Sequence, residues 1–487
     1  MNTKLNRSEW HRSIYSSRWT SEGVNSLEVM EPATGELLDI VGLASKHHVY
    51  EAAEAAVSVQ RRWADTAPGT RAAILRRAAA LFEERKPEIL EILMRESGSI
   101  MPKAEFEFAS VISELHEAAA LTTQPEGLLL PSGSPTRLSI ARRVPIGVVG
   151  VITPWNLPLA LAVRSIAPAV ALGNAVILKP DPKTPISGGL IIAQIFQDAG
   201  LPAGVLSVLP GGAEVGDAIV RHPDIPMISF TGSTVTGKMI ARIAGESLKK
   251  VSLELGGNNA LIVLDDADLE RATSAAAYGS FLHQGQVCVA VGRHIVHRKI
   301  AAQFAEMLAA RAKNLPVGDP YRENVALGPI ISQQQIEKID EFVKSTATAG
   351  ARLLTGGKYD KLFYQPTVLT DVLPGMPTFD YEVFGPVASI TVFDDDEQAV
   401  DLANRGDYGL SSAVQSRSLD RAIAISRGIK AGMVHVNDQT IVYEAHAPFG
   451  GVKNSGNGSR YGSPTNHEEF TTLQWVTTNE VIPAYPF

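Results

Sequence analysis

Residues 146–179, IGVVGVITPWNLPLALAVRSIAPAVALGNAVILK, contain the pattern that decides the fold. The stretch opens with a β-branched run at Ile146–Ile152, continues with an apolar helical run at Leu159–Leu172 and closes with a second strand-like run at Asn174–Lys179. Strands without polar alternation, separated by a helix, are typical of a parallel sheet whose two faces are both covered. The stretch therefore predicts a doubly wound α/β fold.

The alternation continues downstream of this unit. A helical run at Ile186–Ala199 is followed by strand-like runs at Val205–Leu209, Met227–Phe230 and Lys250–Leu255. A second alternating set then follows, at Ala260–Val263, Leu269–His283, Arg293–His297, Ala301–Ala312 and Gln334–Ala349. Because each set can supply one sheet with helices on its faces, the sequence predicts two α/β domains.

The two ends of the chain have different patterns. Upstream, apolar residues at spacings of three and four predict amphipathic helices at Val49–Trp63 and Thr70–Glu96, so we expect the chain to open helical after a short polar lead. Near the C-terminus, a strand-like run at Thr471–Thr477 follows the glycine-rich loop Gly450–Gly462 and has no local partner. We expect this run to pair with a detached segment or with another subunit.

Length and charge exclude several classes of protein. A chain of 487 residues predicts about three domains. Its formal net charge of -8 gives no basic field for nucleic acid, so no nucleic-acid partner is expected. The polar N-terminus, Met1–Thr20, lacks a signal-peptide core, and prolines, a glycine and an arginine interrupt the most apolar stretch, Leu157–Leu178. We expect a cytoplasmic protein with no membrane partner.

The chain contains one cysteine, Cys288, so an intramolecular disulfide is excluded. None of the 11 histidines falls in a metal-ligand spacing, and no metal site is predicted. Cys288 ends the run GQVC (285–288), whose glycine allows a ligand to approach the backbone closely. Two interpretations are open, a buried inert thiol and a nucleophile whose backbone donates to an oxyanion.

Three further motifs place reactive side chains at strand ends. FTGSTVTG (230–237) joins a strand to a helix, which predicts either an anion site or a plain Ser/Thr N-cap. In LELGGN (253–258), Glu254 is either a desolvated general base or a solvated acid. In PWNLP (154–158), Asn156 is either an oxyanion donor or ordinary turn chemistry. Ends of parallel strands are where α/β sheets bind ligands.

Taken together, these motifs resemble the aldehyde dehydrogenase superfamily in order and spacing, from about Val29 to Trp475. The motifs are PWNLP, Lys179-Pro180, FTGSTVTG, LELGGNN, GQVC, EVFGP (382–386) and PFGG (448–451). Within the superfamily, RVPIGVVGVITPWN (143–156), FLHQGQVC (281–288) and HVNDQ (435–439) look most like bacterial benzaldehyde and vanillin dehydrogenases.

The resemblance implies a role for each matching residue. The nucleophile is Cys288, the general base is Glu254 and the oxyanion donor is Asn156. The dinucleotide, NAD, is held by Lys179, Gly232, Ser233, Glu382, Phe384 and Trp155, with Lys179 and Glu382 at its ribose hydroxyls and Phe384 beside the nicotinamide. The aldehyde is contacted by Leu157, Arg164, Tyr443 and Phe449.

The resemblance also implies how the chain is divided. Residues 1–126 and 144–254 form a dinucleotide-binding domain, and residues 255–462 form a catalytic domain. Residues 127–143 and 463–487 form a small β arm that joins copies of the chain into a homodimer or homotetramer.

These assignments describe a complete reaction. A thiolate adds to an aldehyde, the resulting thiohemiacetal loses a hydride to a nicotinamide, and a water activated by Glu254 hydrolyses the thioester to a carboxylate. The preferred substrate is an aromatic aldehyde; the alternatives are an aliphatic aldehyde or semialdehyde, a nicotinamide-independent cysteine acyltransferase or thioesterase, and a non-catalytic protein of the same fold. FTGSTVTG and Glu382 argue against the acyltransferase, and the intact catalytic positions argue against the non-catalytic protein.

Two positions depart from the family pattern. Pro182 stands where many NAD-preferring members carry a glutamate for the adenosine ribose, and Lys183 follows it. Without that carboxylate, NADP use alongside NAD is expected, whether Lys183 attracts the extra phosphate or is a solvated surface charge. Arg164 stands where many relatives carry an aromatic residue, either to bind a ring substituent or to pair with a structural carboxylate.

Overall fold

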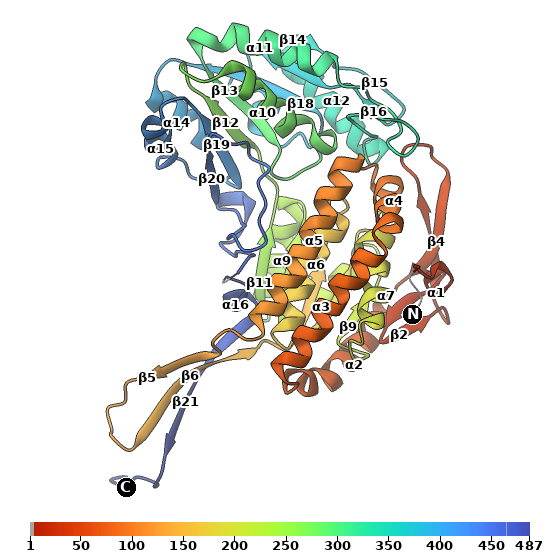
Figure 1. Ribbon diagram of the computed structural model, residues 1–487, viewed down its shortest axis with the longest axis vertical. Helices are drawn as coiled ribbons and strands as arrows, with labels where there is room; N and C mark the ends of the chain where they lie inside the picture. The colour runs from red at the N-terminus through yellow and green to blue at the C-terminus, as the bar shows by residue number, and fades with distance from the viewer. Residues whose placement is uncertain (1–3, 464) are drawn as a thin grey trace.

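The computed structural model describes residues 4–463 and 465–487. Figure 1 shows two α/β units, with an arm of strands projecting from the lower one. Residues 1–3 and 464, which fall within the predicted domain segments, lie outside the described residues. Within the described part of the chain, no helix is long and apolar enough to cross a membrane.

The first unit is built on a seven-stranded sheet in the order β11-β10-β7-β8-β9-β1-β2. Its parallel strands are β7 (Val148–Ile152), β8 (Ala175–Lys179), β9 (Leu206–Val208), β10 (Met227–Thr231) and β11 (Lys250–Glu254). β1 (Ile14–Ser16) and β2 (Arg18–Thr20) extend the sheet as an antiparallel edge. The predicted doubly wound parallel sheet is confirmed.

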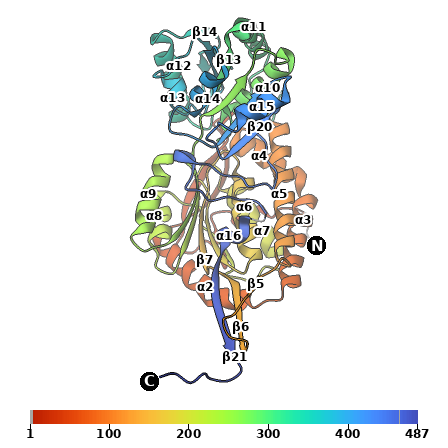
Figure 2. The same ribbon diagram turned by 90° about the vertical axis from the view of Figure 1, so that its left-hand side faces the viewer.

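Alternate residues of β7 pack into two cores, one on each face of this sheet. Val149 and Val151 join one core, whereas Val148 and Ile152 join the other. The first core is covered by α3 (Pro68–Glu84), α4 (Lys86–Ser97), α5 (Met101–Leu121), α6 (Pro158–Ala171) and α7 (Ile191–Asp198), and the second by α2 (Lys46–Ala64), α8 (Ala213–Arg221) and α9 (Thr234–Gly245). Figure 2 shows the sheet between these layers. Burial on both faces explains the uninterrupted apolar run.

Two details near the N-terminus differ from the prediction. The long helices do not follow the polar lead directly, because in the described residues one four-residue helix and four strands precede α2. Only Val29 is fully buried in β3, so this segment carries little apolar signal. The single helix predicted at Thr70–Glu96 is two helices, because Pro87 lacks an N–H and fits the first turn of a new helix. The further elements here are α1 (Arg7–Trp10), β3 (Asn25–Met30) and β4 (Leu37–Leu43).

The second unit has its own seven-stranded sheet, in the order β14-β17-β18-β13-β12-β19-β20. Neighbouring strands are parallel except β14 and β17. The strands are β12 (Asn259–Val263), β13 (Val291–His297), β14 (Arg352–Thr355), β17 (Thr367–Thr370), β18 (Val387–Phe393), β19 (Ser411–Gln415) and β20 (Met433–Val436). The longer helices are α10 (Leu269–Phe281), α11 (Arg298–Lys313), α12 (Gln333–Thr348), α14 (Asp396–Asn404) and α15 (Leu419–Ser426). The predicted second α/β sheet is present.

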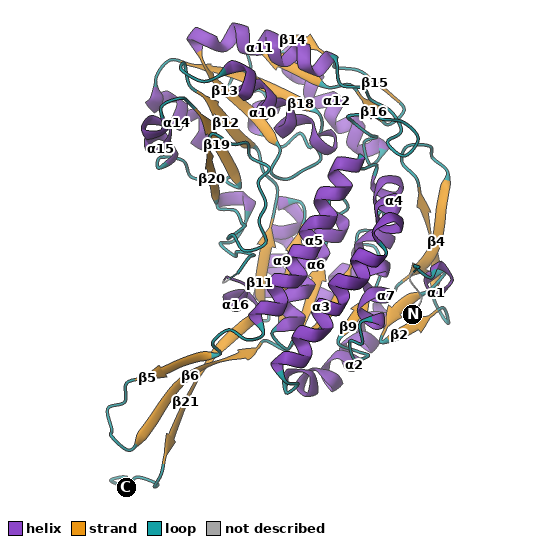
Figure 3. Ribbon diagram, in the orientation of Figure 1, coloured by secondary structure: helices purple, strands orange, loops and turns teal. Residues whose placement is uncertain are grey.

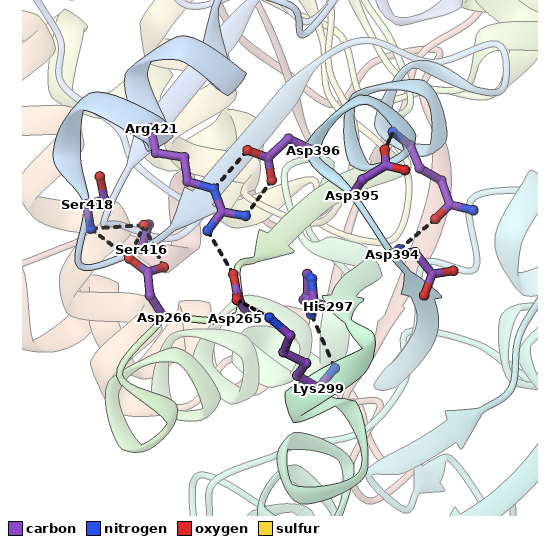
Figure 4. Close-up of polar contacts among 11 residues, drawn as sticks. Asp265, Asp266, His297, Lys299, Asp394, Asp395, Asp396, Ser416, Ser418 and Arg421 are labelled. Carbon is purple, nitrogen blue, oxygen red and sulfur yellow. Dashed lines mark hydrogen bonds and ion pairs between the residues drawn. The ribbon is translucent and has the colours of Figure 1, made fainter.

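A cluster of ion pairs connects three helices of this second unit to the end of β12 (Figure 4). Arg421 of α15 binds Asp396 of α14 (2.5 Å) and Asp265 (2.7 Å), which follows β12. Asp265 also binds Lys299 of α11 (3.1 Å). Hydrogen bonds from Arg421 and Lys299 lower the pKa of Asp265 to about 2. We interpret the cluster as structural, because each of these side chains has a charged partner.

The arm is a three-stranded antiparallel sheet in the order β21-β6-β5. Its strands are β5 (Gly127–Leu130), β6 (Arg137–Pro145) and β21 (Thr471–Asn479). β21 pairs with β6 over its whole length, from Thr471 opposite Pro145 to Asn479 opposite Arg137. The C-terminal strand thus pairs with a detached segment, the first of the two predicted possibilities. Figures 1 and 3 show the arm extending away from both α/β units.

After β20 the chain returns to the first unit. The Leu255 N–H donates to the carbonyl of Ser455 (3.0 Å), and Glu254 forms a β-bridge with Gly456. The Tyr461 hydroxyl bonds to Ser229 of β10 (2.6 Å). The returning segment therefore lies against β10 and β11 and closes one side of the candidate site.

Candidate active site

Three adjoining cavities lie at the candidate site; two are lined by residues of both α/β units and the third by residues of the first unit alone. We call them the apolar cavity (about 460 Å³), the central cavity (about 690 Å³) and the outer cavity (about 1200 Å³). Cys288 borders both the apolar and the central cavity. Gly232 and Ser233 border both the central and the outer cavity. One path therefore leads from the outer cavity to the thiol, which has the apolar cavity on its other side.

Cys288 lies in the loop between a short 3-10 helix (Leu282–Gly285) and β13. Asn259 holds this loop by donating from Nδ2 to the Cys288 carbonyl (2.9 Å). His283 and Gln284 have φ values of 50° and 56°, a left-handed conformation that is uncommon for non-glycine residues. Although Cys288 borders the cavities, burial raises its pKa to about 12. The free enzyme therefore carries a protonated thiol at neutral pH.

Glu254 is the last residue of β11, and its side chain is only 2% exposed. Neither carboxylate oxygen has a hydrogen-bond partner of normal geometry. Burial raises the pKa of Glu254 to about 8, against the opposing attraction of Arg164 and Arg460. The interpretation as a solvated strand-end acid is wrong. A carboxyl group that titrates near neutral pH can act as a general base.

Asn156 follows β7 and is 3% exposed. Its Nδ2 donates to the Gln286 carbonyl (3.0 Å), which ties the PWNLP loop to the loop of Cys288. A side-chain amide carries two donor hydrogens, so the second can serve a ligand in the central cavity, which Asn156 lines. Asn156 thus connects two loops and still has one amide hydrogen available for a ligand.

Lys179, Gly232 and Ser233 all line the outer cavity. Lys179 ends β8, and burial lowers its pKa. A Cβ on Gly232 would lie 2.5 Å from the Phe230 ring, so only glycine fits there. Ser233 is the N-cap of α9, with Oγ accepting from the Thr236 N–H (3.3 Å). The N-cap interpretation of FTGSTVTG therefore holds, and it places the start of α9 at the cavity.

Glu382, Phe384 and Trp155 line the central cavity. Glu382 accepts a hydrogen bond from the Gly257 N–H (2.8 Å), and burial raises its pKa to about 7. A Cβ on Gly256 would lie 2.5 Å from Glu382 Oε2, so glycine is required for this approach. The Trp155 and Phe384 rings meet edge to face, with centroids 5.5 Å apart. Two aromatic rings therefore form one wall beside Cys288.

Arg164 places a buried guanidinium at the apolar cavity. Its Cζ lies 4.8 Å from the Phe449 ring centroid and 4.4 Å from that of Tyr461. Nη2 donates to the Thr231 hydroxyl (3.2 Å), whereas Nε is buried without a hydrogen-bond partner. Its hydrogen-bond partner is thus a hydroxyl, and Nε is a free donor.

Leu157, Tyr443 and Phe449 complete the predicted set, and all three line the apolar cavity. The Tyr443 and Phe449 rings lie 5.8 Å apart in an edge-to-face arrangement. The Tyr443 hydroxyl bonds to Glu114 of α5, which is itself buried. The structure therefore brings twelve of the thirteen predicted site residues to the walls of the three cavities, and the thirteenth is Glu254. Glu254 is the residue immediately before Leu255, a wall of the central cavity.

Comparison with known proteins identifies the family. The model of the aldehyde dehydrogenase family matches residues 19–476. The chain belongs to this family. Its members are oxidoreductases that act on aldehydes. The alternative of an acyltransferase or thioesterase is therefore not favoured.

Similar proteins cover almost the whole chain. A benzaldehyde dehydrogenase [NAD(+)] of Pseudomonas putida is 51% identical, with 98% of each chain covered. A vanillin dehydrogenase of Amycolatopsis sp. is 50% identical, with 99% of each chain covered. The crystal structure of a salicylaldehyde dehydrogenase from Pseudomonas putida G7, complexed with salicylaldehyde, superposes with a TM-score of 0.94 at 35% identity, covering 98% of this chain and 99% of that one.

The residues of this aldehyde dehydrogenase fit a dinucleotide. Gly232 and Gly256 line the central cavity, and Ser233 caps a twelve-residue helix whose first N–H groups attract phosphate. Lys179 is a buried lysine at the outer cavity, and Glu382 is a half-buried carboxylate at the central cavity. Among the described residues, no group of three His, Cys, Asp or Glu side chains could hold a metal ion.

Several cavity residues were missed by the sequence analysis. Phe106 and Ser110 of α5 line the apolar cavity, and so does Ile441. Gln335 and Lys338 of α12 line the central cavity. Phe106 and Ser110 share a helix face at a spacing of four, but that spacing equally describes residues packed in a core. Only the packing of α5 against α6 makes them cavity walls.

Proposed function

We propose that the enzyme oxidises aromatic aldehydes to carboxylic acids with NAD as the hydride acceptor. The observation that carries the proposal is the position of Cys288, between a cavity with aromatic walls and a cavity suited to a nicotinamide. The names of the similar proteins support it, since they specify benzaldehyde, vanillin and salicylaldehyde. The first of these names also specifies NAD.

The first step is addition of Cys288 to the aldehyde carbon. Because burial holds the thiol protonated, its proton must leave as the carbon–sulfur bond forms. That proton passes to solvent through the central cavity, which Cys288 borders, so Glu254 remains ionised for the later step. The aldehyde oxygen becomes an oxyanion, which the spare Asn156 hydrogen and the Cys288 N–H stabilise.

The second half of the reaction releases the product. When bound, NAD supplies the acceptor for the hydride that the thiohemiacetal loses. The acyl group is then held on Cys288 as a thioester. Glu254 takes a proton from water, the hydroxide attacks the thioester carbon, and the sulfur leaves with the acid as the free product. Cys288 forms the covalent bond, and Glu254 assists in breaking it.

A panel of aldehydes tests the proposed substrate class. Phe106, Tyr443 and Phe449 are aromatic walls of the apolar cavity, and each aromatic contact contributes roughly 0.5–1.5 kcal/mol beyond burial. Two or three contacts predict a kcat/KM about a hundredfold higher for benzaldehyde than for acetaldehyde. Initial rates of NADH formation measure the ratio. Equal values for hexanal and benzaldehyde would favour the aliphatic alternative.

The same panel examines Arg164. Because Arg164 lines the apolar cavity beside the Phe449 ring, we propose that its guanidinium binds a ring substituent. Arg164→Leu should then reduce kcat/KM more for hydroxylated benzaldehydes than for benzaldehyde. Equal losses would show that Arg164 acts through Phe449 or through the charge it places near Glu254, and not on a ring substituent.

Cofactor choice is proposed to be relaxed, with NAD preferred and NADP used measurably. Pro182 lines the outer cavity beside Lys179 and offers no carboxylate to a ribose. Pro182→Glu should reduce kcat/KM for NADP about tenfold or more, through repulsion of the extra phosphate. Lys183→Gln separates the two interpretations of that lysine: a loss of NADP use would show that Lys183 attracts the extra phosphate, and no change would show that it is a solvated surface charge. Absence of NADP turnover in the unaltered enzyme would show that another group, such as the nearby Asp181, excludes it.

We also propose the organisation of the assembled enzyme. Residues 1–126 with 144–254 bind the dinucleotide, residues 255–462 carry the nucleophile, and residues 127–143 with 463–487 join subunits in a homodimer or homotetramer. Leu129 and Trp475 of the arm are 74% and 70% exposed, which supports coverage by a second copy. A cytoplasmic location is proposed because reducing compartments keep a catalytic thiol free.

A further inference from the structure

Helix α6 begins two residues after Asn156 and has no capping side chain of its own. Its N-cap residue is Leu157, whereas Ser, Thr, Asp or Asn is normally preferred at that position. Leu157 lines the apolar cavity, so a polar N-cap there would introduce a polar group among the walls. The free N–H groups of the first turn therefore need an acceptor from another element.

That acceptor is Glu107 of α5. Its Oε1 accepts hydrogen bonds from the N–H groups of Leu159 (2.8 Å) and Ala160 (3.1 Å). Its Oε2 binds Nζ of Lys103 at 2.5 Å, one helical turn earlier. The Lys103 and Glu107 side chains are 1% and 0% exposed. One carboxylate oxygen thus serves α6, and the other is neutralised by a lysine.

Stability alone does not explain this arrangement. A buried ion pair contributes little net stability, because the cost of desolvating two charges offsets their attraction. The pair does fix a negative charge at the N-terminus of α6, where the helix dipole favours it. The loop held in this way carries Asn156, whose Nδ2 also binds Gln286 of the Cys288 loop (3.0 Å). Movement of the α6 terminus would therefore displace both loops.

We propose that Lys103 and Glu107 are positioning residues for the oxyanion donor Asn156. Glu107 holds the first turn of α6 and thereby the direction of the Asn156 amide, while Lys103 holds the Glu107 carboxylate in place. The inference rests on the proposed function, because it requires that Asn156 donate to the substrate oxygen.

A double-mutant cycle tests the inference, with kcat, both KM values and the single-turnover rate of NADH formation from benzaldehyde as readouts. Glu107→Gln keeps a carbonyl acceptor but turns an NH₂ group toward Lys103, so the α6 terminus shifts. We expect kcat to fall about tenfold to a hundredfold, with KM for benzaldehyde and NAD within about twofold. The matched control is Glu105→Gln on the same helix, which breaks the exposed pair with Lys86 and should leave kcat unchanged.

The cycle separates positioning from simple helix stabilisation. If Glu107 acts through Asn156, adding Glu107→Gln to Asn156→Ala should change the single-turnover rate by less than about twofold. The inference would be overturned if the losses of rate in Glu107→Gln and Asn156→Ala multiplied in the double variant. It would also be overturned if Glu107→Gln lowered Tm and left kcat normal. A normal rate in Asn156→Ala alone would instead refute the proposed role of Asn156 and remove the basis of the inference. If Glu107→Gln does not fold, Lys103→Met is measured in the same cycle, and an unchanged kcat in that variant overturns the proposal.

Discussion

Cys288→Ala should lower kcat with benzaldehyde by at least about a thousandfold, because the substitution removes the atom that forms the covalent intermediate. The change deletes only Sγ at the junction of two cavities, so the fold and the cofactor cavities should persist. Quenching of tryptophan fluorescence by NADH checks this, since Trp155 lines the central cavity. Initial rates measured with NAD and benzaldehyde give the loss.

Chemical labelling provides an independent check on the nucleophile. Because Cys288 is the only cysteine, iodoacetamide should modify the native enzyme once and inactivate it in parallel. Burial raises the pKa of the thiol to about 12, so labelling should accelerate as pH rises through the neutral range without reaching a plateau. Substantial activity in Cys288→Ala, or full activity after complete labelling, would contradict the assignment.

Glu254→Gln should pass one hydride per active site and then stop, because the amide cannot take a proton from the deacylating water. The expected record is a burst of NADH followed by a steady rate reduced on the order of a thousandfold. Mass spectrometry after one turnover should find an acyl adduct on Cys288. Cofactor binding with neither burst nor adduct would place Glu254 at the first step, as the acceptor of the thiol proton.

The raised pKa of Glu254 adds a test of stability. Burial raises this pKa from 4.5 to about 8, so the folded state binds a proton that the unfolded state releases. Between pH 4.5 and about 8, the free energy of unfolding therefore falls as the pH rises. Glu254→Gln removes this cost and should have a higher Tm than the unaltered enzyme at pH 8, with a smaller difference at pH 5. In the unaltered enzyme, the steady rate should rise with pH around 8, as Glu254 loses its proton. This rise should be absent from Glu254→Gln.

The sequence predicted those site residues whose reactive side chain lies in a short motif next to a recognisable strand or helix. Glu254 ends a recognisable apolar strand, Asn156 follows another, and Cys288 is the single cysteine, three residues after a glycine. Phe106 and Glu107 carry no such signal, because their roles arise only when α5 packs against α6. An acid and an aromatic residue on a helix are equally typical of ordinary packing.

The same reasoning applies to the fold. Strands buried on both faces, such as β7, were predicted because uninterrupted apolar runs are distinctive. β3 and β4 were missed because a half-exposed hairpin carries little apolar periodicity. The division between α3 and α4 depends on Pro87, and a helical periodicity can continue through a proline even though the backbone cannot.

The pairing of β21 with β6 has a consequence for synthesis on the ribosome. Strand β6 is complete after residue 145, but its partner begins only at Thr471, and Tyr461 is also needed to bind Ser229. During most of translation the nascent first unit therefore keeps an open strand edge that can associate with neighbouring chains. Ribosomes that stall before residue 471 would release chains in which this strand edge is still open. We expect nonsense truncations after residue 460 to be cleared by proteases or to aggregate, even though every catalytic side chain is already present.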